Sequence, residues 1–330
     1  MRAGPRRDRE GMALLAVLLL VAVMAVVAVA VLDDVRFSVR RTTNAEIGAQ
    51  AQWYADGAET LARRRIGRLT ALSPNPDRTP LTPEWNGRAI TLPIDGGTLT
   101  ATVRDGQACF NLNSVVAWTG DRLAARPAGE AQLMALGRAV GVDPLRMRTI
   151  TDSLIDWIDT DTTARPLGAE DSAYAALAEP YRTGGVPLVE VSELRTVRGV
   201  DGDAYARLRP HLCALPTDRS PINVNTLTPA DAPLLVMLTG GSLSLPGARA
   251  VIAARPVGGW SDPAGFWSQP ALNSLPVALS ARDQVTVRTD YFAVRIDVDH
   301  GGVHAVRTAL IESRPGGEAR TIIRRWTLED

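Results

Sequence analysis

Acidic side chains are concentrated in one short stretch near the middle of the chain. They are Asp152, Asp156, Asp159, Asp161, Glu170 and Asp171. Carboxylates this close together repel one another, so the fold needs a positive charge to offset them. Oxygen ligands grouped in this way suit Ca²⁺, whereas a stretch without His or Cys does not suit Zn²⁺. We therefore expect a calcium ion here. The candidate ligands are Asp156, Asp159, Asp161, Glu170 and Asp171.

A helix must position the first of these residues. Ile150, Leu154 and Ile158 recur at helical spacing and predict an amphipathic helix over residues 145–158, with the aspartates on its opposite face. This arrangement also allows an interpretation without a metal, in which the acidic face is solvated and nearby arginines neutralise it. Those arginines are Arg146, Arg148 and Arg165. The sequence leaves both interpretations open, because the spacing is not that of the helix-loop-helix calcium motif.

Catalytic motifs are not found in the sequence. His300 and His304 flank a Gly-Gly turn, and we expect both on the surface. There is neither a glycine-rich phosphate loop nor a serine-nucleophile motif. We therefore expect no catalytic residues and no enzymatic activity. The alternative is a membrane-anchored periplasmic hydrolase that uses the acidic cluster for general acid–base chemistry, which paired carboxylates can perform.

Residues 12–32 form an uncharged apolar segment without Gly or Pro. At about 1.5 Å per residue its length matches a bilayer core of about 30 Å, where the backbone must be helical. Several arginines precede the segment, and Asp33 and Asp34 follow it. This asymmetry predicts a cytoplasmic N-terminus, with the rest of the chain outside. An uncleaved signal anchor and a cleaved signal peptide are the alternatives, although the segment is long for a signal peptide.

Charge and cysteine content narrow the class of protein further. Lys+Arg and Asp+Glu both total 36, and this balance argues against nucleic acid as the main partner. Cys109 and Cys213 both fall in the part placed outside the membrane, so we expect one disulfide between them. Two buried free thiols are the alternative. If it forms, the disulfide closes a loop of about 100 residues, which chain-entropy models value at roughly 4–5 kcal/mol.

Helix and strand patterns alternate in blocks along the rest of the chain. Helical periodicity continues over 35–72 up to a proline-rich break, and strands are expected at 89–93 and 98–104. Residues 114–216 are mainly helical. Residues 291–328 contain three strands joined by glycine turns, which should pair antiparallel. The fold class is therefore α+β, with a large helical insertion between the strands.

A second helical segment is expected at residues 221–280. Two short helices flank the Thr-Gly-Gly-Ser turn at 239–242, an order that resembles helix-hairpin-helix modules. In DNA-binding versions this turn donates backbone N–H groups to phosphate and is supported by Lys or Arg. Few basic residues surround the turn in this chain, so we interpret the segment as a packing module. A DNA-binding or DNA-uptake pilin is the alternative function.

The start of the chain resembles the leader of type IV pilin-like proteins. RxxREG at residues 6–11 stands directly before the apolar helix. In that family a prepilin peptidase cuts after the glycine, here between Gly11 and Met12, and the new N-terminal residue is methylated. Most such pilins then carry Glu at the position that Ala16 occupies here. Its absence fits a subunit at the filament tip, which has no neighbour above it.

Further motifs follow in the order seen in the protein K family, the large minor pseudopilins of bacterial type II secretion. They are CFNLN, LIDWIDTD, GAEDSAY, VSELRTVRGV, INVNT and YFAVRIDV. The resemblance implies a transmembrane pilin helix, a pilin-like antiparallel sheet with a large inserted helical domain, and calcium around the LIDWIDTD–GAED loop. It also implies a complex with minor pseudopilins I and J that caps and initiates the pseudopilus. The anchor would lie in the inner membrane and the head in the periplasm.

The resemblance and the patterns together predict a domain order. The expected units are a leader (1–11), a transmembrane helix (12–32), the first part of the pilin-like domain (33–113), an inserted SAM-like helical domain (114–220), a second helix-hairpin-helix segment (221–280) and the C-terminal strands (281–330).

Overall fold

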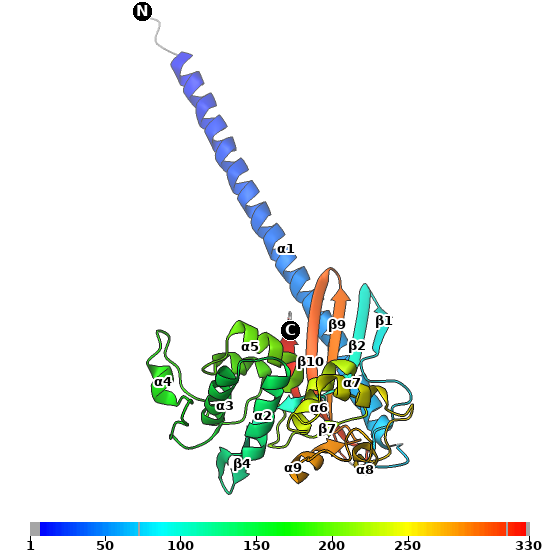
Figure 1. Ribbon diagram of the computed structural model, residues 1–330. Coiled ribbons are helices and arrows are strands. Elements are labelled where there is room, and N and C mark those ends of the chain that lie inside the picture. Colours follow the sequence, from blue (N-terminus) through cyan, green and yellow to red (C-terminus); the bar gives the residue numbers. More distant parts are fainter. Residues whose placement is uncertain (1–6, 72, 315, 328–330) are drawn as a thin grey trace, which may run out of the picture.

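A single long helix carries the rest of the protein. The computed structural model describes residues 7–71, 73–314 and 316–327 (Figure 1). Helix α1 (Arg7–Ala71) is continuous over 65 residues. Its segment 12–32 is exposed along its whole length. Among the described residues, α1 alone is long and apolar enough to cross a membrane. Residues 1–6 of the expected leader lie outside the described residues.

The C-terminal part of α1 packs against a five-stranded antiparallel sheet. The strands are β1 (Ala89–Ile94), β2 (Gly97–Asp105), β9 (Tyr291–His300), β10 (Val303–Ser313) and β11 (Ala319–Thr327), in the order β1-β2-β9-β10-β11. The expected strands at 89–93 and 98–104 are confirmed as β1 and β2, and the three antiparallel C-terminal strands are confirmed as β9, β10 and β11. Alternate residues of β9 are buried, as expected for a sheet with one covered face.

Small residues let the helix approach this sheet closely. The buried positions of α1 are Ala51, Ala55, Ala58, Ala62 and Ile66. They repeat at helical spacing and meet the buried side chains of the sheet. Those side chains include Leu99, Phe292, Val294, Ile296, Val298 and Ile311. The helix and sheet therefore share one hydrophobic core, which fixes the direction in which the apolar anchor leaves the head.

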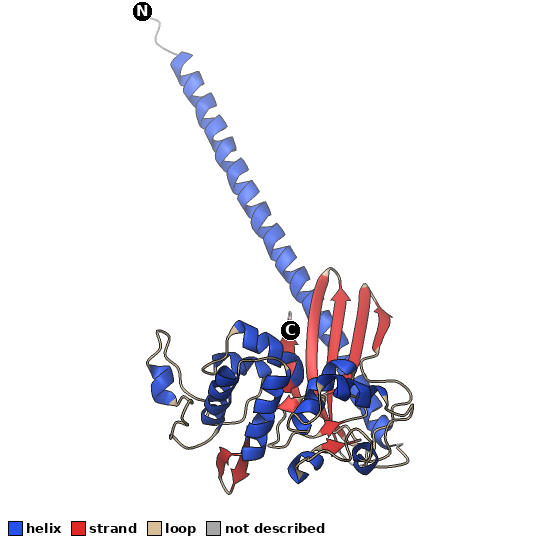
Figure 2. Cartoon of the chain, in the orientation of Figure 1, coloured by secondary structure: helices blue, strands red, loops and turns tan. Residues whose placement is uncertain are grey.

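A second hydrophobic core holds the chain between β2 and β9. Its helices are α2 (Pro127–Ala139), α3 (Pro144–Ile158), α4 (Asp171–Ala175), α5 (Gly202–Leu208), α6 (Ala232–Leu238), α7 (Leu245–Ala253), α8 (Pro263–Trp267) and α9 (Leu279–Arg282). Short 3₁₀ turns cover Leu112–Val115, Val191–Thr196, Arg209–His211 and Pro229–Asp231. Buried residues of both helical segments belong to this one core, and the helices gather beside and below the sheet (Figure 2). Leu133 on α2 and Leu235 on α6 are two of its members.

Short strands complete the inserted region. They are β3 (Phe110–Asn111) paired parallel with β6 (Leu212–Cys213), β7 (Ile222–Asn223) paired parallel with β8 (Val285–Thr286), and the hairpin of β4 (Val116–Thr119) with β5 (Arg122–Ala125). Each parallel pair joins the beginning of a segment to its end. The inserted chain therefore returns to the point at which it leaves the sheet.

Two local expectations were wrong. The hairpin β4–β5 lies in a region expected to be helical, where Leu123 packs into the core while its neighbours are exposed. His300 is buried rather than on the surface, because its ring is held between Gln50 on α1 and the Asp95 carbonyl. His304 is exposed, as expected, and contacts Asp299.

Candidate metal centre

The end of α3 and the start of α4 bring three carboxylates together. Asp159 directly follows α3 as its C-cap, Asp161 lies in the loop beyond it, and Glu170 directly precedes α4. One carboxylate oxygen from each of the three lies within 4.8 Å of the others. This spacing lets a single cation contact all three groups, with backbone carbonyls and water available as further oxygen ligands.

Two oxygens of this group have no hydrogen-bond donor. Oδ1 of Asp159 and Oε1 of Glu170 are buried and without a partner among the described residues. Both side chains are more than nine-tenths buried, with relative exposures of 6% for Asp159 and 7% for Glu170. A buried carboxylate oxygen without a donor is costly, so these two atoms fit the role of cation ligands.

The pKa shifts of Asp159 and Glu170 also indicate that this site needs a positive charge. Burial, followed by the charges of Asp161, Asp156 and Glu170, raises the pKa of Asp159 to about 7. Burial and the charges of Asp156, Asp161 and Asp171 also raise the pKa of Glu170. In both residues the negative form is penalised by its surroundings. A divalent cation would remove this penalty and restore both carboxylates to their ionised form.

Arginine pairing accounts for a different part of the acidic stretch. Nε of Arg165 lies 3.1 Å from Oδ1 of Asp152, and its NH2 atom lies 2.7 Å from Glu130 Oε2. Arg148 also pairs with Glu130 and Asp152. Neutralisation by arginine therefore describes Asp152, but this side chain is buried rather than solvated. Arg146 pairs instead with Asp201 on another segment. Asp159, Asp161 and Glu170 have no arginine partner among the described residues.

The two other candidate ligands lie outside the group of three. Asp156 is buried and accepts hydrogen bonds from the backbone N–H of Arg165, at 3.1 and 3.3 Å. Asp171 is exposed, and its Oδ1 accepts from both the N–H and the hydroxyl of Thr183 at 2.9 Å. These bonds lower the pKa of Asp171. Asp171 therefore orders the loop after α4 in this structure.

Sequence reasoning did not identify the residues that shape the loop. Glu130, which comes from α2, was not considered as a partner of Arg165, because the two residues are far apart in the sequence. Gly168 was also missed, although the space that a Cβ there would need is occupied by the carboxylate of Asp156. The GAED motif contained this glycine, so a close backbone approach could have been inferred from it.

Asparagines and a disulfide fix the base of the inserted region. Cys109 and Cys213 form a disulfide with an S–S distance of 2.06 Å. Asn111 in the CFNLN motif donates to the carbonyls of Thr217 and Arg219 at 2.7 and 2.8 Å. These bonds add to the backbone pairing of β3 with β6, where the chain enters and leaves the insertion. The motif is therefore explained by packing and hydrogen bonding.

The INVNT motif has a similar role at the second segment. Asn223 donates to the hydroxyl of Thr289 at 2.8 Å. Asn225 both donates to the carbonyl of Trp260 and accepts from its N–H, at 2.9 and 2.8 Å. The hydroxyl of Thr226 donates to Asp105 at the end of β2. The motif thus joins the helix-hairpin-helix segment to the sheet.

Comparison with known proteins assigns this architecture to a family. Two sequence models described as type II secretion system protein K match residues 108–217 and 222–288. Together they cover more than half of the chain. The chain belongs to the type II secretion system protein K family. The resemblance inferred from the motifs is thereby confirmed, and the chain is a minor pseudopilin of this system.

Members of the protein K family are similar to this chain over most of its length. The protein from Klebsiella pneumoniae is 38% identical over 306 residues, covering 93% of each chain. The protein from Aeromonas hydrophila is 36% identical over 91% of each chain. A chain in the crystal structure of the GspK-GspI-GspJ complex from enterotoxigenic Escherichia coli superimposes with a TM-score of 0.78. It is 32% identical, and the match covers 88% of this chain and 100% of that one.

Proposed function

We propose that this protein is the tip subunit of a type II secretion pseudopilus, where it caps and initiates the filament together with minor pseudopilins I and J. The observation that carries the proposal is the match over 100% of a chain solved within a GspK-GspI-GspJ complex. Secreted proteins would then cross the outer membrane through the system that this filament serves. The pilin-like core of α1 and the sheet supplies the part that docks on the other subunits.

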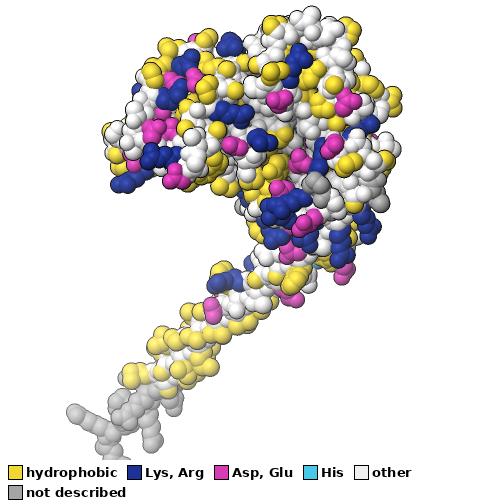
Figure 3. Space-filling view, turned by 90° about the horizontal axis from the view of Figure 1, so that it is seen from below, with side chains coloured by type: hydrophobic (Ala, Val, Ile, Leu, Met, Phe, Trp, Pro, Cys, Tyr) yellow, Lys and Arg dark blue, Asp and Glu magenta, His cyan; other side chains and the backbone are white. Residues whose placement is uncertain are grey.

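The size of the head supports a position at the tip. The head of the protein is much wider than the single helix that extends from it (Figure 3). Subunits inside a pilin-like filament pack around a bundle of their α1 helices, and a head of this width leaves little space for a neighbour above it. Ala16, at the position where most pilins carry Glu, also suits a subunit without an upper neighbour.

The anchor supports a position in the inner membrane. We infer that a prepilin peptidase cuts between Gly11 and Met12 and leaves the apolar segment in place, with a methylated N-terminus. The fully exposed apolar surface of residues 12–32 needs a lipid or helical environment. The disulfide of Cys109 and Cys213 suits the oxidising periplasm, where we place the head.

We also propose that calcium binds at Asp159, Asp161 and Glu170. The unpartnered buried oxygens and the raised pKa values of two of these groups support a cation at this point. The ion would join the end of α3 to the start of α4 and replace like-charge repulsion by attraction. Its role would be structural, because it stiffens a loop of the inserted region. Asp156 lies next to the group, and Asp171 orders the loop beyond it.

Co-purification tests the proposed complex. The full-length chain would be co-expressed with pseudopilins I and J of its own system and extracted in a mild detergent. The proposal predicts that all three chains elute together at one stoichiometry. The major pseudopilin of the same system, which shares the type of anchor, is the control for association through the apolar helix alone. Elution of this chain apart from a stable I–J pair would contradict the proposal.

A further inference from the structure

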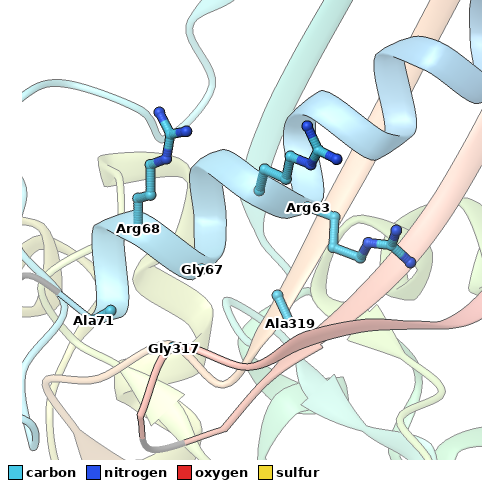
Figure 4. Close-up of a pocket in the computed structure, with 7 residues that line it drawn as sticks. Arg63, Gly67, Arg68, Ala71, Gly317 and Ala319 are labelled. Atoms are coloured by element: carbon cyan, nitrogen blue, oxygen red, sulfur yellow. The ribbon is translucent and has the colours of Figure 1, made fainter.

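A cluster of arginines without acidic partners surrounds a hollow at the end of α1. The hollow has a volume of about 400 Å³ and is lined by Arg63, Arg64, Gly67, Arg68, Ala71, Gly317 and Ala319. Its floor is formed where the helix meets the hairpin between β10 and β11 (Figure 4). Gly67 and Gly317 make this contact possible, since a Cβ on Gly67 would lie 2.6 Å from the Gly317 carbonyl oxygen.

The arginines of this hollow differ from those of the neighbouring strands. Among the described residues, Arg63, Arg64 and Arg68 take part in no ion pair within the chain. The arginines of β10 and β11 are paired: Arg307 with Asp56 and Glu59, Arg320 with Glu312, Arg324 with Glu59 and Arg325 with Glu190. The strand arginines thus pair with Asp56 and Glu59, two carboxylates of α1 that precede Arg63 in the sequence. Glu59, one turn before Arg63, is buried and bound to Arg324 at 2.6 and 2.8 Å.

The position of the cluster limits what it can bind. Like charges this close on one helix cost stability, and the helix dipole favours only those in the last turn, here Arg68. Counted along the helix from Leu32, Arg63 lies about 46 Å beyond the apolar segment, at about 1.5 Å per residue. That distance is several times the screening length of about 8 Å, so charged lipid headgroups attract the arginines only weakly. A second protein fits the charge of the cluster better, because its carboxylates can form bidentate pairs with the arginines.

We propose that the hollow bounded by Arg63, Arg64 and Arg68 is a docking surface for an acidic segment of a partner protein. The rim supplies guanidinium groups, and Figure 4 shows Arg68 pointing away from the hairpin that carries Gly317. The backbone floor is formed by the close contact of Gly67 with Gly317. An extended chain with Asp or Glu side chains would lie across the hollow and pair with several arginines at once.

A binding experiment with an acidic peptide tests the proposal. The probe is a fluorescein-labelled peptide of eight glutamates, measured by anisotropy on the full-length chain in a non-ionic detergent at 50 mM salt. The test variant is Arg64→Gln/Arg68→Gln, and the matched control is Arg138→Gln/Arg249→Gln, two exposed arginines on α2 and α7 without partners among the described residues. We expect about tenfold weaker binding in the test variant and less than about twofold in the control.

Three results would overturn the proposal. The first is an equal loss of affinity in both double variants, which would indicate a general charge effect. The second is equal binding of an eight-glutamine peptide, which would show that carboxylates are not recognised. The third is displacement of the glutamate peptide by inorganic phosphate far better than by chloride at the same ionic strength, which would indicate a small-anion site. Unchanged thermal unfolding of the variants shows that each has folded.

Discussion

Substitution of Asp159 by Asn should remove the response of this protein to calcium. The carboxylates of Asp159, Asp161 and Glu170 can place one oxygen each within 4.8 Å of the others. At an effective dielectric constant of about 20, two unit charges at that separation repel by about 3.5 kcal/mol. This repulsion, added to burial, explains why the pKa of Asp159 rises to about 7. A divalent ion reverses the sign of these interactions.

The size of the calcium effect follows from linkage. At a free calcium concentration about 100 times the dissociation constant, binding stabilises the folded state by about 2.7 kcal/mol. For a head of this size, that corresponds to a rise in Tm of roughly 5–10 °C. The rise should shrink as the pH falls below about 7, because protons then compete with the ion for Asp159.

Differential scanning calorimetry of the full-length chain in detergent measures this effect. We expect a higher Tm in 1 mM CaCl₂ than in EDTA at about pH 7.5, and a smaller rise in MgCl₂. Asp159→Asn should lose the rise and, in EDTA, be at least as stable as the parent, because one repelling charge is gone. Asp121→Asn, at an exposed turn, is the matched control and should keep the rise. A calcium response that persists in Asp159→Asn would refute the reasoning.

Three further substitutions test other parts of the structure. With calcium saturating, Asp105→Asn should flatten the pH dependence of Tm between about pH 4 and 8. Burial raises the pKa of Asp105 to about 7 in the folded state. The stability that this group contributes is therefore full below the unfolded pKa of about 3.9 and is lost as the pH rises through 7. Cys109→Ser/Cys213→Ser should lower the free energy of unfolding in urea by about 4–5 kcal/mol, the chain-entropy value for a loop of this length; a loss under about 1 kcal/mol would contradict it. Arg307→Met should lower the free energy of unfolding by about 3 kcal/mol in the same assay, because the buried carboxylate of Glu59 then keeps only one of its two arginine partners. An unchanged unfolding midpoint would show that Arg324 alone is enough to neutralise Glu59.

Periodicity and turn chemistry predicted much of the fold. Apolar residues at helical spacing on α1 and alternating residues in β9 are local signals, and the sheet that they form follows from glycine turns. The hairpin β4–β5 was missed because its four-residue strands carry little pattern. His300 was misplaced because its partner Gln50 lies far away in the sequence. Burial that depends on distant chain segments cannot be predicted from a short stretch of sequence.

The candidate metal centre was predicted only in outline. The acidic stretch was recognised by composition, and the oxygen chemistry followed from the absence of His and Cys. The sequence could not separate the residues that arginines neutralise from those that lack a partner. That separation depends on Glu130, which binds Arg165 from α2, whereas Asp159 and Glu170 each keep one buried oxygen without a hydrogen-bond donor among the described residues. Asp171 was grouped with them by proximity in sequence, yet it binds Thr183.

The central claim is that this subunit sits at the end of a pseudopilus. Its most direct test is electron microscopy of pseudopili assembled from the complete set of pseudopilins, with a gold-labelled tag in the exposed turn at Gly120–Asp121 of this chain. We predict one label at one end of each filament, and no filaments with label along the shaft. Regular labelling along the length, or filaments of normal number and length without this chain, would contradict the account.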